Sequence, residues 1–141
     1  MEKWVAYAFV SMFFAGFTSV IAKMGLAGIS GELGLTIRTL FVFGFVLAFA
    51  AWAVPMQELA GVSSRNLLWL GLSGVTTSLS WIFYYKALKV GDVATVALID
   101  KGSVAVAMLL AWLLLREIIT LRMVVGAALI VAGLIVIAKK P

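Results

Sequence analysis

Apolar residues run through this chain in five long stretches, separated by short segments that hold most of the turn-forming residues. The stretches cover residues 4–28, 35–54, 67–88, 93–115 and 121–138. A transmembrane helix needs about 20 predominantly apolar residues, and each stretch is near that length. The pattern predicts an all-α integral membrane protein, a single domain over residues 1–141 built as a five-span helical bundle.

Turn and capping residues mark the ends of these stretches. Pro55 ends the second, and Ser63 or Ser64 can cap the third. Asp92 and Thr120 stand where they can cap the fourth and the fifth. Because the connections are short, consecutive helices should be antiparallel neighbours.

Composition narrows the class of protein further. Hydrophobic residues make up 65% of the chain, charged residues 12%, and the mean hydropathy is +1.18. A conventional soluble enzyme is thereby excluded, since soluble domains are about a quarter charged. The net charge of +5 is spread among helix ends, which indicates membrane topology rather than nucleic-acid binding. The chain has no Cys and no His, so we expect no disulfide, no cofactor and no metal site.

Charged side chains lie within or directly beside the apolar stretches, where they are costly and usually functional. These residues are Lys23, Arg38, Lys86, Asp100, Lys101, Arg116 and Glu117. At a rise of 1.5 Å per residue, Lys23, Arg38, Lys86 and Asp100 should all lie within roughly 4 to 12 Å of the same membrane side. With Lys101 they would form a cluster rich in positive charge, which favours binding of a carboxylate or phosphate group.

Helical spacing predicts which residues face a cavity. Lys23 shares a face with Ser19, and Asp100 shares a stripe of small side chains with Ser103. Adjacent residues of a helix point about 100° apart, so only one of Asp100 and Lys101 can point into the interior. We expect it to be Asp100, because Asp100 lies on the stripe of small side chains. Its expected ion-pair partner is Lys101, Lys86 or Lys23.

Each of these residues also has a structural interpretation. The cations of the first three stretches can extend to the lipid headgroups, and Asp100 can hold two helices together in a salt bridge. The pair Arg116 and Glu117 lies at a helix end, where an architectural role is favoured. Aromatic residues of the third stretch, such as Trp81 and Tyr84, suit an interfacial belt, with substrate stacking as the second interpretation.

The numbers of cations on the two sides of the membrane are nearly equal, so the positive-inside rule gives only a weak preference for one orientation. One side would hold Lys3, Arg65, Arg116 and Arg122, and the other Lys89, Lys139 and Lys140. So weak a bias permits insertion in both orientations, and two opposed copies would reproduce the inverted repeats of many transporters. Other topogenic signals fixing one orientation are the alternative.

Several segments together resemble a known family. They are YYKALKVGD at 84–92, ALIDKGS at 97–103, the pair at 116–117, and GAALIVAG at 126–133. In order and spacing they are similar to the EamA-like domain of the drug/metabolite transporter superfamily, in its short form with one five-helix domain. The resemblance implies a transporter of the prokaryotic cytoplasmic (inner) membrane that needs a second copy or a partner to supply the other half.

The last stretch carries a face of small residues, Gly126 and Gly133 with Ile130 between them. Such faces let helices approach closely. The resemblance implies that this face is the dimer seam, with packing inside one subunit as the alternative. The resemblance also implies that cationic drugs are disfavoured, because the first stretch lacks the lone Glu of the small multidrug exporters.

We therefore expect a transporter subunit that moves a small polar metabolite, bearing an acidic group, by alternating access in an antiparallel homodimer within the lipid bilayer. The expected substrate-binding or coupling residues are Lys23, Arg38, Lys86, Asp100, Lys101, Ser19, Ser103, Trp81 and Tyr84. Two alternatives stay open. One is a carrier of lipid-linked or amphiphilic substrates, and the other is a non-transporting membrane assembly component.

Overall fold

The computed structural model describes residues 2–138, which contain helices and no strand. In chain order these are α1 (Lys3–Gly25), α2 (Gly31–Ala53), α3 (Met56–Leu59), α4 (Ser64–Val90), α5 (Val93–Asp100), α6 (Ser103–Leu110), a π-helical turn (Ala111–Leu115) and α7 (Leu121–Ala138). Four segments of the described chain are long and apolar enough to cross a membrane: Lys3–Gly25, Gly31–Ala53, Ser64–Val90 and Val93–Leu115. Helix α7 is apolar but shorter, so the all-helical membrane class is confirmed while a fifth span stays a prediction.

Capping side chains shift several helix ends from the expected positions. Helix α2 begins at Gly31 instead of residue 35, because the Ser30 hydroxyl accepts a 3.2 Å hydrogen bond from the Leu33 amide. Helix α4 begins before residue 67, because Ser63 and Asn66 exchange backbone and side-chain hydrogen bonds of 3.2 Å. The Met123 amide donates to the Thr120 hydroxyl at 3.4 Å, so Thr120 caps α7 as expected.

Two further boundaries differ from the sequence prediction. Helix α1 ends at Gly25, and the turn after it places Gly28 at a φ of 74°, which favours a residue without a Cβ. The connection after Pro55 contains the four-residue helix α3. Asp92 stands at the N-cap of α5, but its side chain makes no capping hydrogen bond.

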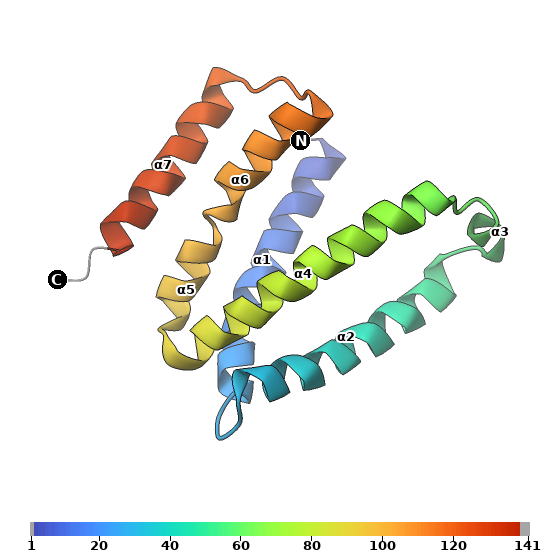
Figure 1. Cartoon of the computed structure of the whole chain (residues 1–141), viewed down its shortest axis with the longest axis horizontal. Coiled ribbons are helices and arrows are strands. Elements are labelled where there is room, and N and C mark those ends of the chain that lie inside the picture. Colours follow the sequence, from blue (N-terminus) through green and yellow to red (C-terminus); the bar gives the residue numbers. More distant parts are fainter. Residues whose placement is uncertain (1, 139–141) are drawn as a thin grey trace. The chain divides into compact units, whose positions relative to one another are not determined.

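The chain divides into two parts, Val20–Val90 and a second part made of Met1–Ser19 and Gly91–Pro141. In the first part α2 and α4 are antiparallel and joined through α3 (Figure 1). The buried side chains of this part are Leu26, Tyr85 and Leu88, at 3%, 4% and 0% exposure. These three side chains lie where the carboxyl ends of α1 and α4 meet the start of α2. The packing of this part is therefore concentrated at one end of its helices.

In the second part, the fourth apolar stretch does not form one continuous helix. The amides of Lys101 and Gly102 donate to carbonyls only three residues back, at 3.0 and 2.9 Å, which tightens the backbone between α5 and α6. A Cβ added at Gly102 would lie 2.9 Å from the Leu134 side chain of α7. Helix α7 returns alongside α5 and α6 (Figure 1).

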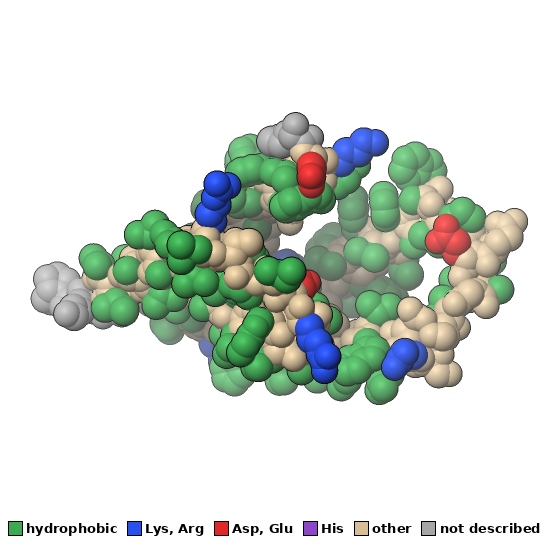
Figure 2. Space-filling view, turned by 90° about the horizontal axis from the view of Figure 1, so that it is seen from above, with side chains coloured by type: hydrophobic (Ala, Val, Ile, Leu, Met, Phe, Trp, Pro, Cys, Tyr) green, Lys and Arg blue, Asp and Glu red, His purple; other side chains and the backbone are tan. Residues whose placement is uncertain are grey.

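Most apolar side chains of the chain are exposed. Of the best 18-residue windows in the four candidate spans, 6% of the first is buried and none of the other three. Figure 2 shows hydrophobic side chains over most of the face that it draws, with a few charged side chains between them. Such a surface requires hydrocarbon or another apolar partner around it, since a water-soluble monomer rarely exposes large apolar patches.

Because α2 and α4 approach closely at Gly31, adding one methyl group there should lower the stability of the protein. A Cβ at Gly31 would lie 2.9 Å from the Tyr85 carbonyl oxygen, and backbone atoms cannot move aside as a side chain can. We expect Gly31→Ala to destabilise the protein by about 1–3 kcal/mol. The measurement is the melting temperature of the purified protein in detergent.

Gly44→Ala on the same helix is the matched control, because nothing lies within 4 Å of its added Cβ. It should be neutral or stabilising by up to about 1 kcal/mol. Equal melting temperatures for the two variants would show that the α2–α4 approach at Gly31 is looser than described.

Candidate functional site

Arg38 lies on α2 with its guanidinium against aromatic rings of α4. Its Cζ atom is 4.2 Å from the centroid of the Trp81 ring and 5.8 Å from that of Tyr85. Its Nη1 atom is buried and has no hydrogen-bond partner among the described residues. A buried N–H of a charged group that lacks an acceptor costs on the order of 1–3 kcal/mol or more. The structure therefore brings Arg38 and Trp81 together and leaves a donor of Arg38 unsatisfied.

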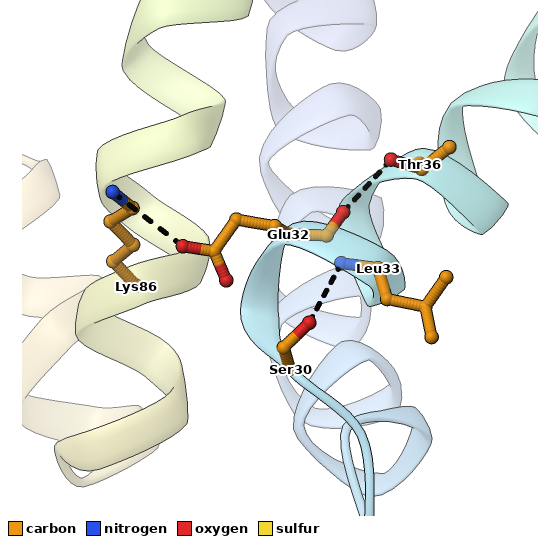
Figure 3. Close-up of polar contacts among 5 residues, drawn as sticks. All are labelled: Ser30, Glu32, Leu33, Thr36 and Lys86. Carbon is orange, nitrogen blue, oxygen red and sulfur yellow. Dashed lines mark hydrogen bonds and ion pairs between the residues drawn. The ribbon is translucent and has the colours of Figure 1, made fainter.

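Lys86 is paired with a carboxylate that the sequence analysis did not consider. Its Nζ atom is 3.5 Å from Oε1 of Glu32, and Figure 3 shows Glu32 reaching from the first turn of α2 toward α4. Both side chains are more than half exposed. Glu32 follows the Ser30 cap by two residues, and acidic residues are favoured in the first turn of a helix. This position could have identified Glu32 from the sequence. The positive excess expected at Lys86 is thereby offset locally.

Lys23 and Lys89 cap each other's helices. The Nζ atom of Lys23 donates to the carbonyl oxygens of Leu88 at 2.6 Å and Lys89 at 3.3 Å, in the last turn of α4. The Nζ atom of Lys89 donates to the carbonyl oxygen of Leu26 at 2.9 Å, just beyond α1. Carbonyls at a helix end have no partner within the helix, so each ammonium supplies one. This contact indicates a structural role for Lys23, and its role in substrate binding stays a prediction.

Asp100 and Lys101 lie where α5 ends, and they contact each other. Oδ2 of Asp100 is 3.8 Å from Nζ of Lys101, with side-chain exposures of 41% and 53%. The backbone between Asp100 and Ser103 is tightened and α6 begins anew at Ser103, so the predicted stripe does not lie on one continuous α-helix. That Asp100 and Ser103 line one cavity stays a prediction. Of the partners expected for Asp100, the structure pairs it with Lys101.

The remaining predicted residues are placed as follows. Ser19 is buried, and its hydroxyl donates to the Ala15 carbonyl at 3.3 Å within α1. Tyr84 is half-buried, with its ring centroid 6.4 Å from that of Tyr85. The Tyr85 ring lies beside the Arg38 guanidinium. The four-residue spacing from Trp81 was the signal for Tyr85, since residues four apart share a helix face.

The predicted seam residues of α7 have different surroundings. Gly126 and Ile130 line a groove of about 490 Å³ between α6 and α7, within the chain. A Cβ added at Gly133 meets nothing within 4 Å, and Gly133 does not line that groove. The dimer seam stays a prediction, and Lys139 and Lys140, used in the topology argument, lie outside the described residues.

The chemistry available at Arg38 is anion binding. Among the described residues, no group of three or more His, Cys, Asp or Glu side chains could hold a metal ion. A guanidinium has five N–H donors in one plane and binds planar carboxylates with two parallel hydrogen bonds. Arg38 is therefore the residue of this part of the chain best suited to an acidic ligand.

Comparison with known proteins agrees with the membrane character of the fold. The model of the EamA-like transporter family matches residues 2–139. A protein of Sinorhizobium sp. named "Uncharacterized transporter in cobO 3'region" is 36% identical over 137 residues, which is 97% of this chain and 97% of that protein. No solved structure matches the chain.

The reciprocal lysine contacts predict that Lys23 supports the fold. We expect Lys23→Met to lower the melting temperature by several degrees, because charge-assisted hydrogen bonds contribute roughly 1.5–3 kcal/mol. The measurements are the melting temperature and, in vesicles containing equal amounts of folded protein, the KM for a transported solute.

Lys3→Met is the control, since Lys3 is exposed at the start of α1. The structural role requires an unchanged KM in Lys23→Met. A raised KM at an unchanged melting temperature would instead assign Lys23 to substrate binding.

Proposed function

Because the chain belongs to the EamA-like transporter family, we propose that it is a transporter subunit that moves a small polar metabolite bearing a carboxylate. The observation that carries this proposal is the buried, unpartnered Nη1 of Arg38 beside Trp81. The membrane in question is the cytoplasmic (inner) membrane of a prokaryote, in keeping with the bacterial relative.

The surroundings of Arg38 favour an acidic ligand over a cationic one. Among the described cations of Val20–Val90, Lys86 lies against Glu32, while Lys23 and Lys89 donate to backbone carbonyls. Arg38 has aromatic rings beside it instead of a carboxylate. In a medium of low dielectric constant, a guanidinium without a carboxylate partner strongly favours binding of an anion.

The aromatic contact also holds the guanidinium in place. A cation over a tryptophan ring is stabilised by about 0.5–2 kcal/mol, depending on desolvation. An arginine that is already positioned loses less conformational entropy when its ligand binds. Trp81 thus serves as a positioning residue for Arg38, and Tyr85 extends the aromatic wall.

Alternating access requires a second half, which we propose is another copy in the opposite orientation. One chain contains few buried side chains and a single set of these helices. Two opposed copies, each with α7 as a fifth span, would form the inverted pair that transporters use to expose one site to either side. Substrate can shift the equilibrium between the two states, open to one side of the membrane or to the other, only if it binds them with different affinities.

Removal of the guanidinium should weaken transport of acids specifically. In vesicles containing purified protein, we expect Arg38→Gln to raise the KM for labelled mono- and dicarboxylic acids by about ten-fold or more. Arg38→Lys keeps the charge but loses the paired donors, so it should fall between Arg38→Gln and the unaltered protein. The corresponding amides are the neutral comparators.

Arg65→Gln is the matched control, since Arg65 is exposed in the first turn of α4. Uptake of acids by Arg38→Gln equal to that of Arg65→Gln would remove Arg38 from the site. Uptake of the amides as readily as the acids by the unaltered protein would overturn the carboxylate class.

The opposed-copy arrangement predicts a mixed topology. The chain has no native cysteine, so Lys140→Cys introduces a single thiol near one end. An impermeant thiol reagent applied to intact cells should label about half of the molecules, and disruption of the membrane should expose the rest. Complete labelling from one side, or none until disruption, would exclude an antiparallel homodimer.

A further inference from the structure

We propose that the α6–α7 groove binds one molecule of phosphatidylethanolamine, with an acyl chain along the groove and the headgroup at Arg116 and Glu117. The residues of this site belong to the second part of the chain, whereas Arg38 belongs to the first. It is independent of the transported substrate, so its test is a lipid-binding measurement.

The groove has the size and lining of a ligand site. Its volume of about 490 Å³ falls within the range of roughly 300–1,000 Å³ typical of small-molecule pockets. Ala107 and Met108 of α6 form one wall, and Met123 and Ile130 of α7 form the other. Apart from Glu117, in the connection between these helices, its lining is apolar. Such a lining suits a hydrocarbon chain.

A second hollow, partly polar, shares lining residues with the groove. The hollow has a volume of about 570 Å³ and is lined by Trp112, Arg116 and the residues that follow. Glu117 and Ile119 line both spaces. An apolar groove that shares its lining with a hollow holding a cation, an acid and a tryptophan matches a phospholipid in its order of polarity. Tryptophan is typical of the level of the headgroups.

The backbone at Arg116 has a conformation that is unusual for an arginine. Arg116 has a φ of 55°, the left-handed conformation that usually holds glycine or asparagine at a helix end. For another residue this conformation costs roughly 1–2 kcal/mol. The Arg116 amide donates to the Ala111 carbonyl and closes the π-helical turn, and the Glu117 amide donates to the same carbonyl at 3.2 Å, as at many helix ends that finish in a left-handed residue. π-Helical turns and strained residues both concentrate at functional sites.

The two charges select the headgroup. No ion pair within 4.0 Å joins Arg116 to Glu117 or to another described carboxylate. A guanidinium binds phosphate well, and a carboxylate accepts hydrogen bonds from a primary ammonium. Phosphatidylethanolamine supplies both groups. A choline headgroup lacks the N–H donors, and a glycerol headgroup lacks the positive charge.

A second copy of this chain is the competing occupant, since Gly126 and Ile130 also belong to the predicted dimer seam. The charged, aromatic mouth of the groove favours the lipid. An apolar helix that docked there would desolvate Arg116 and Glu117 without providing partners, which is costly.

The experiment is native mass spectrometry of the purified full chain in detergent, titrated separately with the dioleoyl forms of phosphatidylethanolamine, phosphatidylcholine and phosphatidylglycerol. We expect one ethanolamine lipid to bind roughly three- to five-fold more tightly than either other lipid, a ratio suited to exposed ion pairs. Glu117→Gln should abolish the preference over phosphatidylcholine, whereas Glu58→Gln should keep it. Arg116→Gly, which suits the left-handed backbone, should weaken binding of all three lipids.

A matched pair of glycine variants tests the groove itself. A Cβ meets nothing within 4 Å at either Gly126 or Gly133, but only Gly126 lines the groove. Gly126→Leu should therefore reduce binding of the ethanolamine lipid by several fold, and Gly133→Leu should leave it unchanged. Equal binding of the three lipids, or equal effects of the two glycine variants, would overturn the site. A disulfide between two Ile130→Cys chains in membranes would place a second copy in the groove and exclude the lipid.

Discussion

The end of the molecule where α1, α2 and α4 meet depends on two ammonium groups that satisfy backbone carbonyls across helices. Lys23 holds the last turn of α4, and Lys89 holds the chain just after α1. In a bilayer, water is scarce near such carbonyls, so an unsatisfied helix end is costly. Leu26 and Leu88 are buried where the carboxyl ends of α1 and α4 meet. The turn that leads into α2 begins directly after these contacts in the chain.

The packing where α1, α2 and α4 meet also determines which charged groups lie near Arg38. Since Gly31 allows the start of α2 to approach the Tyr85 carbonyl, the next residue, Glu32, comes within reach of Lys86, which follows Tyr85. The second turn of α2 then places Arg38 against Trp81 and Tyr85. Lys23, Lys86 and Lys89 thus have carboxylate or backbone partners, whereas the Arg38 guanidinium faces aromatic rings. That difference, and not the total of positive charges, supports the proposal of an acidic ligand.

The second part of the chain shows how a membrane protein can combine an interrupted helix with an apolar surface. The backbone tightens between Asp100 and Ser103, where Gly102 packs against Leu134 of α7. Beyond this point a groove lies between α6 and α7, and the π-helical turn after α6 ends at Arg116 in a left-handed conformation. With most apolar side chains exposed, the helices are held by few internal contacts, so lipid or a second copy contributes to their packing.

The sequence alone determined the class of protein, because runs of about 20 apolar residues can hardly form anything but membrane helices. It also located most of the helices within a few residues and singled out Arg38, Lys86 and Trp81 as candidates for the site. It did not identify Glu32 or Tyr85, nor the backbone contacts of Lys23, nor the break after Asp100. Those depend on which atoms meet across helices and on small departures from helical geometry. A pattern of residue types along one chain does not record the distance between helices, so only the tertiary structure decided which charges are paired and which remain for a ligand.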